Sequence, residues 1–423
     1  MGARVVDARK MSEEDWLALS FEASQLFSPS TPLSESDLFA GRSSQIEKMF
    51  EATSERGKHV ILFGERGVGK TSLAKLFSNF FPKTLRHIIA VREQCDPTDN
   101  FSSIWRKVFK DIYVRMEEDG SQVTRPISDT LNDILTPDDV RRQLDGLFTP
   151  NQVPIVVIDE FDKVEDREAS ALMANTIKSL SDYGVNVTII LVGVADSIVE
   201  LVGEHASVQR CIEQILMPRM EMPERKQVLA KIVPKLGMKI QADADWKIAD
   251  LSRGLPSYIH SLGLYAVQSA IQRRSIQVLN SDVDAAISRV LERSQETVRQ
   301  VYATAIHSNR ADSLYKEVLL ACALAETNER GLFTPQAVCQ PLTGILKRDK
   351  LVEIAAFQQH LKKFITAERG EVLVRKGRER AFQFRFSDPM MQPFVIMKGI
   401  EQGLVSRDAM SVLSSPAQGV LPI

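Results

Sequence analysis

The stretch that most constrains the fold is ILFGERGVGKTSLAKLF, residues 61–77. An apolar run leads into a glycine-rich turn, and a helical pattern then opens on Lys70 and Thr71. The turn matches G-x-x-x-x-G-K-[ST], a pattern in which backbone N–H groups at a helix start surround phosphate oxygens. The predicted phosphate contacts are Gly64, Glu65, Arg66, Gly67, Val68, Gly69, Lys70 and Thr71.

Two side chains of this loop have separate expected roles. Lys70 should reach the β- and γ-phosphates of a nucleotide, and the Thr71 hydroxyl should bind Mg²⁺. The alternative is a glycine-rich turn without a ligand. The complete motif, preceded by a strand pattern and followed by a helix pattern, argues against that alternative.

A second motif, IVVIDEFD, covers residues 155–162. Its four apolar residues predict a buried strand, with Asp159 at the carboxyl end, where open α/β sheets bind ligands. We expect Asp159 to hold Mg²⁺ through water and Glu160 to act as the general base on the attacking water. An acidic pair could also simply begin the next helix, but the phosphate-binding loop upstream favours the catalytic interpretation.

Around these motifs, strand and helix patterns alternate up to about residue 220. Short β-branched strands separated by helices predict a doubly wound parallel sheet with both faces covered. The expected strands are residues 59–63, 87–91, 154–159 and 187–193, and the expected helices are residues 71–81, 101–116 and 170–184.

The remaining chain divides into three parts. Residues 1–35 are predicted to be an N-terminal leader, whose amphipathic piece gives way to the Ser/Pro-rich SPSTPLSESD. Residues 222–308 show helical patterns without strands, which predicts a helical lid domain. Residues 309–423 show helices and then EVLVRKGRERAFQFRF, two period-two strands around a turn, which predicts a winged-helix domain with a C-terminal tail.

Composition restricts the function classes. A net charge of −2 argues against non-specific, charge-driven binding of nucleic acid. It does not exclude a local basic surface. We find neither a signal peptide nor an apolar run long enough to span a membrane, and expect a cytoplasmic protein. The four cysteines are far apart in sequence and are expected to be reduced, mostly buried thiols.

The phosphate-binding loop, the Asp-Glu strand end and the following helical region together resemble AAA+ ATPases. The segment LFAGRSSQIEKM, residues 38–49, resembles one that lies beside the adenine in the origin-recognition, initiator-like and STAND branches. The resemblance covers residues 36–305 and makes residues 36–221 an AAA+ α/β domain. It implies that Phe39, Gly41 and Arg42 lie on the adenine side; a surface turn is the alternative for the Gly-Arg pair.

Three further AAA+ elements are less complete. The polar sensor expected after strand 187–193 falls near Val194 and Ala195, so it is displaced or absent. Arg210 stands where the family places the arginine finger that acts on a neighbouring subunit's γ-phosphate, with a solvated helix-end arginine as the alternative. Pro256 lies in a segment that resembles sensor 2, but Ser257 replaces the expected arginine, which implies slow turnover.

The predicted hairpin concentrates positive charge. Its cations are Arg375, Lys376, Arg378, Arg380 and Arg385. Such a wing could contact DNA phosphates, but lysine and arginine also protect exposed strand edges. The apolar segment 386–400 is expected to pack back on this domain as core, with a partner-docking tail as the alternative.

The resemblance implies an ATP- and Mg²⁺-dependent switch or assembly ATPase that forms homo-oligomers through its ATP sites. In the first hypothesis it acts on double-stranded DNA through the winged helix, as initiators and transposition regulators do. In the second it is a STAND-like scaffold that assembles with an effector protein in bacterial antiviral defence or signalling.

Overall fold

A computed structural model describes residues 8–29, 40–81, 87–118, 121–147, 152–194, 208–309, 313–377 and 381–405. The chain falls into two compact units. The first, here called the α/β unit, comprises Pro32–Glu65 and Gly69–Met217. The second, here called the helical unit, comprises Met1–Thr31, Arg66–Val68 and Pro218–Ile423.

The α/β unit is built on a five-stranded parallel sheet of order β2-β5-β6-β1-β7. Its strands are β1 (His59–Gly64), β2 (His87–Gln94), β5 (Gln152–Asp159), β6 (Thr188–Gly193) and β7 (Ile212–Met217). All six residues of β1 and of β6 are buried, as expected of strands covered on both faces. The predicted doubly wound sheet is therefore confirmed.

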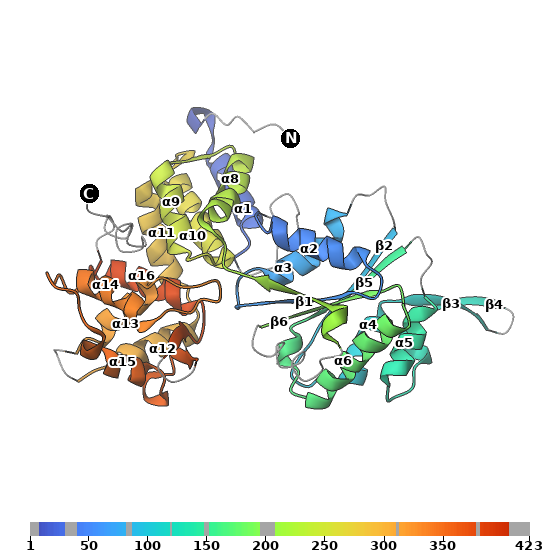
Figure 1. The fold of residues 1–423 in the computed structure, drawn as a ribbon. Coiled ribbons are helices and arrows are strands. Elements are labelled where there is room, and N and C mark those ends of the chain that lie inside the picture. Colours follow the sequence, from blue (N-terminus) through green and yellow to red (C-terminus); the bar gives the residue numbers. More distant parts are fainter. Residues whose placement is uncertain are drawn as a thin grey trace, which may run out of the picture. The chain divides into compact units, whose positions relative to one another are not determined.

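Helices cover both faces of this sheet, with α2 and α3 on one face and α4, α5 and α6 on the other (Figure 1). Their bounds are α2 Ser43–Ser54, α3 Lys70–Leu76, α4 Phe101–Lys110, α5 Pro137–Asp145 and α6 Arg167–Asp182. Helix α4 buries an aromatic row of Phe101, Trp105 and Phe109 in the core below the sheet. Thr136 caps α5 by accepting from the Asp139 N–H, and Pro137 occupies its first turn.

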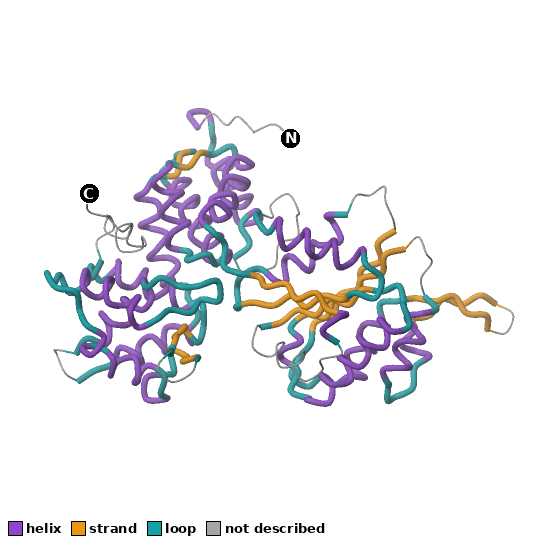
Figure 2. The backbone as a smooth tube through the Cα atoms, in the orientation of Figure 1, coloured by secondary structure: helices purple, strands orange, loops and turns teal. Residues whose placement is uncertain are grey.

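The predicted helix 101–116 is wrong in its second half. Helix α4 ends at Lys110, and the chain then forms the antiparallel strands β3 (Tyr113–Glu118) and β4 (Ser121–Pro126). Figure 2 shows this hairpin projecting away from the helices of its unit. The physical reason is local, because the β-branched and aromatic residues after Asp111 favour a strand and find a partner strand immediately downstream.

The helical unit contains helices where the sequence predicts them in residues 222–308, and it also contains α1 from the N-terminal segment. Its helices up to residue 306 are α1 Glu13–Leu26, α8 Met222–Ile232, α9 Ala242–Leu251, α10 Pro256–Gln272, α11 Asn280–Glu292 and α12 Glu296–Ile306. The expectation of no strands in the lid is wrong, because β8 (Lys239–Ile240) pairs with β9 (Gln277–Val278). Helix α1 packs on α10, and Phe27 meets His260 edge to face.

The C-terminal part of this unit contains helices and a hairpin. Its elements are α13 Tyr315–Leu324, α14 Pro335–Ile345, α15 Gln358–Phe364, β10 Leu373–Lys376, β11 Gln383–Phe386 and α16 Met391–Glu401. An isolated bridge joins Phe333, between α13 and α14, to Phe384 of the hairpin. Helix α16 is buried along most of its length, which confirms that this segment is core.

Two further expectations concern the whole chain. All four cysteines are buried free thiols, as predicted. Among the helices that the structure describes, none is both long and apolar enough to cross a membrane.

Candidate nucleotide site

The loop that connects β1 to α3 has the backbone that its glycines require. Gly69 has a φ of 96° as the N-cap of α3, a left-handed conformation that favours glycine. Gly64 ends β1 so close to β7 that a Cβ atom would collide with the Met217 carbonyl oxygen. Helix α3 therefore begins at Lys70, directly after the turn.

Lys70 is turned back over its own loop. Its Nζ donates to the carbonyl oxygens of Gly64, at 3.0 Å, and Glu65, at 2.8 Å. Burial lowers the pKa of Lys70, while the nearby carboxylates of Asp162, Asp159, Glu65 and Glu160 oppose that shift. The ammonium group is thus held among main-chain oxygens and acidic side chains.

The structure brings Thr71 and Asp159 together. Thr71 Oγ1 lies 3.4 Å from Asp159 Oδ1, and Asp159 is buried at the carboxyl end of β5. A hydroxyl and a carboxylate oxygen are suitable ligands for Mg²⁺ when nucleotide phosphates supply the others. No group of three or more His, Cys, Asp and Glu side chains in the described part of the chain is arranged to hold a metal ion alone.

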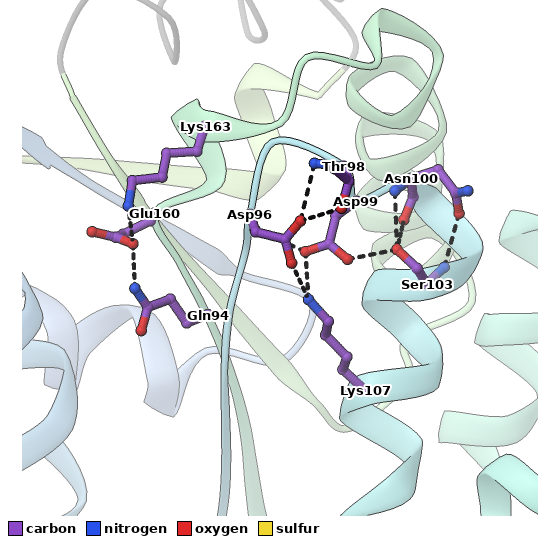
Figure 3. A network of polar contacts seen from close by, with 9 residues as sticks. All are labelled: Gln94, Asp96, Thr98, Asp99, Asn100, Ser103, Lys107, Glu160 and Lys163. Carbon is purple, nitrogen blue, oxygen red and sulfur yellow. Dashed lines mark hydrogen bonds and ion pairs between the residues drawn. The ribbon is translucent and has the colours of Figure 1, made fainter.

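Glu160 follows Asp159 with a φ of 55°, which is uncommon for a residue with a side chain. Its Oε2 accepts from Gln94 Nε2 and from Lys163 Nζ, the latter at 2.6 Å (Figure 3). Gln94 is the last residue of β2 and lies directly opposite Asp159 in the sheet register. The expected general base is therefore held by two side chains that the motif alone does not reveal.

Arg92 is a further residue that sequence reasoning missed. Its guanidinium Nη2 lies 2.7 Å from Asp159 Oδ2, so β2 supplies a cation to the buried carboxylate of β5. In sequence, Arg92 is an ordinary polar residue at a strand end. No signal in a single sequence assigns β2 to the position beside β5.

The loop after β2 is fixed by its own polar network. Lys107 Nζ forms ion pairs with Asp96, at 2.9 Å, and with Asp99, at 2.6 Å (Figure 3). Asn100 and Ser103 together cap the start of α4. The Cys95 N–H donates to the Asp159 carbonyl oxygen at 2.9 Å. This network anchors the strand end that carries Arg92 and Gln94.

The adenine-side residues are partly described. Gly41 and Arg42 both have a φ of 67°, and Arg42 is buried at the start of α2, which packs against β1 and β7. Phe39 lies outside the described residues. The role of this segment in adenine binding stays a prediction.

Arg210 is exposed and forms an ion pair with Asp182 at the end of α6. It lies just before β7, as the sequence predicted, and its action across a subunit interface stays a prediction. Arg219 is held differently, because its guanidinium donates to Gln392 of α16 inside the helical unit.

The remaining predicted residues belong to other regions. Pro256 is the first residue of α10 in the helical unit, so its part in nucleotide binding stays a prediction. The position expected for the sensor lies near Val194, which is described, and Ala195, which is not. Of the predicted wing cations, Arg375 and Lys376 lie on β10, whereas Arg378 and Arg380 lie outside the described residues.

The parallel sheet, the glycine-rich loop and the acidic strand end define a P-loop nucleotide-binding fold of the AAA+ type. In agreement, residues 53–202 match the family model of the AAA domain. No curated protein sequence matches the chain.

Solved structures resemble the chain over most of its length. The Walker-type ATPase PABY2304 of Pyrococcus abyssi aligns with a TM-score of 0.50 and 16% identity over 88% of this chain and 99% of that one. The ORC2 protein of Aeropyrum pernix aligns at 0.49 and 16%, covering 90% and 98%. The ORC1 protein of Aeropyrum pernix, solved in complex with DNA, aligns at 0.45 and 13%, covering 87% and 94%. At these identities, the likeness to PABY2304 shows the fold alone.

Proposed function

We propose that this chain is an ATP-binding and slowly hydrolysing AAA+ switch or assembly ATPase. The observation that carries the proposal is the meeting of α3 and β5, which places Thr71 Oγ1 3.4 Å from Asp159 Oδ1. Lys70 is the first residue of α3, and Glu160 directly follows β5. These are the groups that nucleotide binding and hydrolysis require at one sheet edge.

In this proposal, backbone N–H groups of the loop and the start of α3 bind the phosphates. Lys70 exchanges its two main-chain carbonyl partners for the β- and γ-phosphate oxygens. Thr71 and Asp159 hold Mg²⁺, which neutralises phosphate charge when bound. The expected adenine contacts are Phe39, Gly41 and Arg42.

Glu160 accepts the proton of the attacking water. In the structure its Oε2 accepts from Gln94 and Lys163, which restrict the orientation of the carboxylate. A base held in this way supports slow turnover, as does Ser257 in place of the expected arginine. Assembly or partner binding would supply the rearrangement.

Oligomerisation is proposed through Arg210. Its side chain is 69% exposed, so its guanidinium is accessible to a neighbouring subunit once Asp182 releases it. A cation there stabilises charge that develops on the neighbour's γ-phosphate. The ATP site would then be complete only between two subunits.

We further propose that the C-terminal elements form a winged helix that contacts double-stranded DNA. Three helices, a hairpin and the Phe333–Phe384 bridge follow the expected order. Basic side chains occur in two segments of this region. Arg375 and Lys376 lie on the hairpin, and Lys347, Arg348 and Lys350 border an open hollow of about 830 Å³ that Asp349 and Glu353 also line. Cations on exposed loops are suited to phosphate contacts.

The DNA proposal is tested by replacing Arg375, Lys376, Arg378 and Arg380 with Ala. Each lost phosphate contact should remove about 0.9 from the slope of log affinity against log salt concentration. Arg375 also stacks on Phe382 at 4.3 Å, so folding of the variant is checked by its melting curve. Equal slopes for wild type and variant would remove DNA from the wing's role.

The STAND-like alternative differs from this proposal in its partner, which is an effector protein in place of DNA. It is favoured by the held position of Glu160, since a scaffold needs ATP binding more than turnover. Double-stranded DNA should stimulate hydrolysis under the first proposal. Stimulation only by an effector protein would support the second.

A further inference from the structure

Arg92 occupies an unusual place beside the proposed Mg²⁺ ligands. It lies on β2 two residues before Gln94, so both side chains belong to the same face of the sheet. The register places Arg92 opposite Val157 and Gln94 opposite Asp159. From this position its Nη2 reaches Asp159 Oδ2 at 2.7 Å.

The two oxygens of Asp159 have different partners. Oδ1 accepts from the Glu160 main-chain N–H at 2.9 Å and lies 3.4 Å from Thr71 Oγ1. Oδ2 is paired with Arg92. Main-chain bonding thus already orients Oδ1 toward Thr71, so the main contribution of Arg92 is its positive charge.

That charge lies close to where both ligands would bind. The Asp159 side chain is only 2% exposed and the Arg92 side chain 31%, so water screens their surroundings weakly. A fixed cation at this position repels a divalent cation and attracts polyphosphate. These two effects act in opposite directions on Mg²⁺ and on free ATP.

We propose that the positive charge of Arg92 makes nucleotide binding less dependent on Mg²⁺. Its guanidinium supplies part of the positive charge that the phosphates and Asp159 need. The inference rests on the proposed function, because it requires ATP to bind at this site. In this proposal a residue of β2 contributes to nucleotide affinity, although β2 belongs to neither of the two sequence motifs.

The measurable quantity is the ATP dissociation constant in EDTA divided by that in excess Mg²⁺, here called the magnesium ratio. Removing the charge with Arg92→Gln weakens binding of free ATP more than binding of the Mg²⁺–ATP complex, whose net negative charge is smaller, so the ratio rises. Even with the full screening of bulk water, one unit charge about 5 Å from a divalent ion gives a rise of at least about tenfold, and weaker screening makes the rise larger. Arg92→Lys keeps the charge and should stay within about twofold of wild type.

Calorimetric titration of the full chain with a non-hydrolysable ATP analogue gives both dissociation constants. The matched control is Arg142→Gln on α5, which removes the same charge from an exposed ion pair with Asp138 and should leave the ratio unchanged. A guanidinium that merely orients a metal ligand predicts the opposite result, since losing such support typically lowers metal affinity 10–100-fold. An unchanged or lower ratio in Arg92→Gln would overturn the proposal.

Two outcomes separate this inference from the proposed function. If wild type binds no ATP analogue in either condition, the nucleotide site itself is wrong. If wild type binds the analogue and Lys70→Ala does not, the nucleotide site is correct, and the magnesium ratio alone tests the role of Arg92. Because a buried carboxylate loses its partner, folding is checked by circular dichroism, and Arg92→Ala serves as a second neutral variant. Unfolding of both neutral variants would overturn the proposal in favour of a structural ion pair.

Discussion

Thr71 Oγ1 lies 3.4 Å from Asp159 Oδ1, although 88 residues separate the two in sequence. The contact joins the first turn of α3 to the end of β5. In the sheet, β6 lies between β5 and β1, the strand that leads into α3. The site therefore depends on the strand order of the whole sheet.

Glu160→Gln separates binding from chemistry. The amide keeps the side-chain volume but cannot accept the proton of water, so ATP should bind with near wild-type affinity while hydrolysis falls by 100-fold or more, about the size of a lost general base. Phosphate release at saturating ATP measures the rate, and calorimetry measures the affinity. Turnover close to that of wild type would show that Glu160 is not the base.

Arg210→Ala should lower hydrolysis in the assembled protein while leaving ATP affinity of the isolated chain unchanged. A finger that acts across an interface contributes on the order of 10³-fold in rate. Mixing Arg210→Ala with Glu160→Gln should restore part of the activity, because some interfaces then combine an intact base with an intact finger. Arg142→Gln is the control for an exposed, ion-paired arginine. The absence of rescue in a mixture shown to co-assemble would contradict the assignment.

His59 should make the α/β unit sensitive to acid. It is fully buried, its Nδ1 accepts from the Ile189 N–H at 3.0 Å, and burial lowers its pKa from 6.5 to about 3. Below pH 6.5 the unfolded chain takes up a proton that the folded chain does not, so stability falls as the pH drops toward 3. Between pH 7 and pH 5 the loss is about 2 kcal/mol.

Hydrogen exchange of peptides that cover β1, corrected for intrinsic rates, measures this loss at the two pH values. His59→Gln keeps a hydrogen-bond acceptor but does not titrate, so it should lose that part of the pH dependence. The same pH dependence in both proteins would assign the acid sensitivity to other groups.

The main features of the nucleotide site were predictable because they are local. The glycine-rich loop and the Asp-Glu strand end each specify their geometry within a few residues, and both lie where expected. Arg92 and Gln94 were not predictable. Their roles arise from the register between β2 and β5, and no short sequence pattern encodes which strands become neighbours.

The error at residues 111–116 has a different origin. Ile112, Tyr113 and Val114 continue an apolar pattern that fits the preceding helix as well as a strand. The pair Asp119-Gly120, typical of hairpin turns, was the signal that favoured a strand. Pairing of β3 with β4 decided between the two patterns, as tertiary context often does for short segments.

The central claim is that the loop around Lys70 binds ATP. Lys70 Nζ now donates only to the carbonyl oxygens of its own loop in the hydrogen bonds described, and it is the cation placed to exchange them for phosphate oxygens. The most direct test is calorimetric titration of wild type and Lys70→Ala with a non-hydrolysable ATP analogue and Mg²⁺, with Lys75→Ala on the same helix as control. Saturable binding by wild type and Lys75→Ala, with at least a 100-fold loss in Lys70→Ala, is the predicted result, since about 3 kcal/mol or more of charged contacts disappears. Equal affinity in all three proteins would contradict the account.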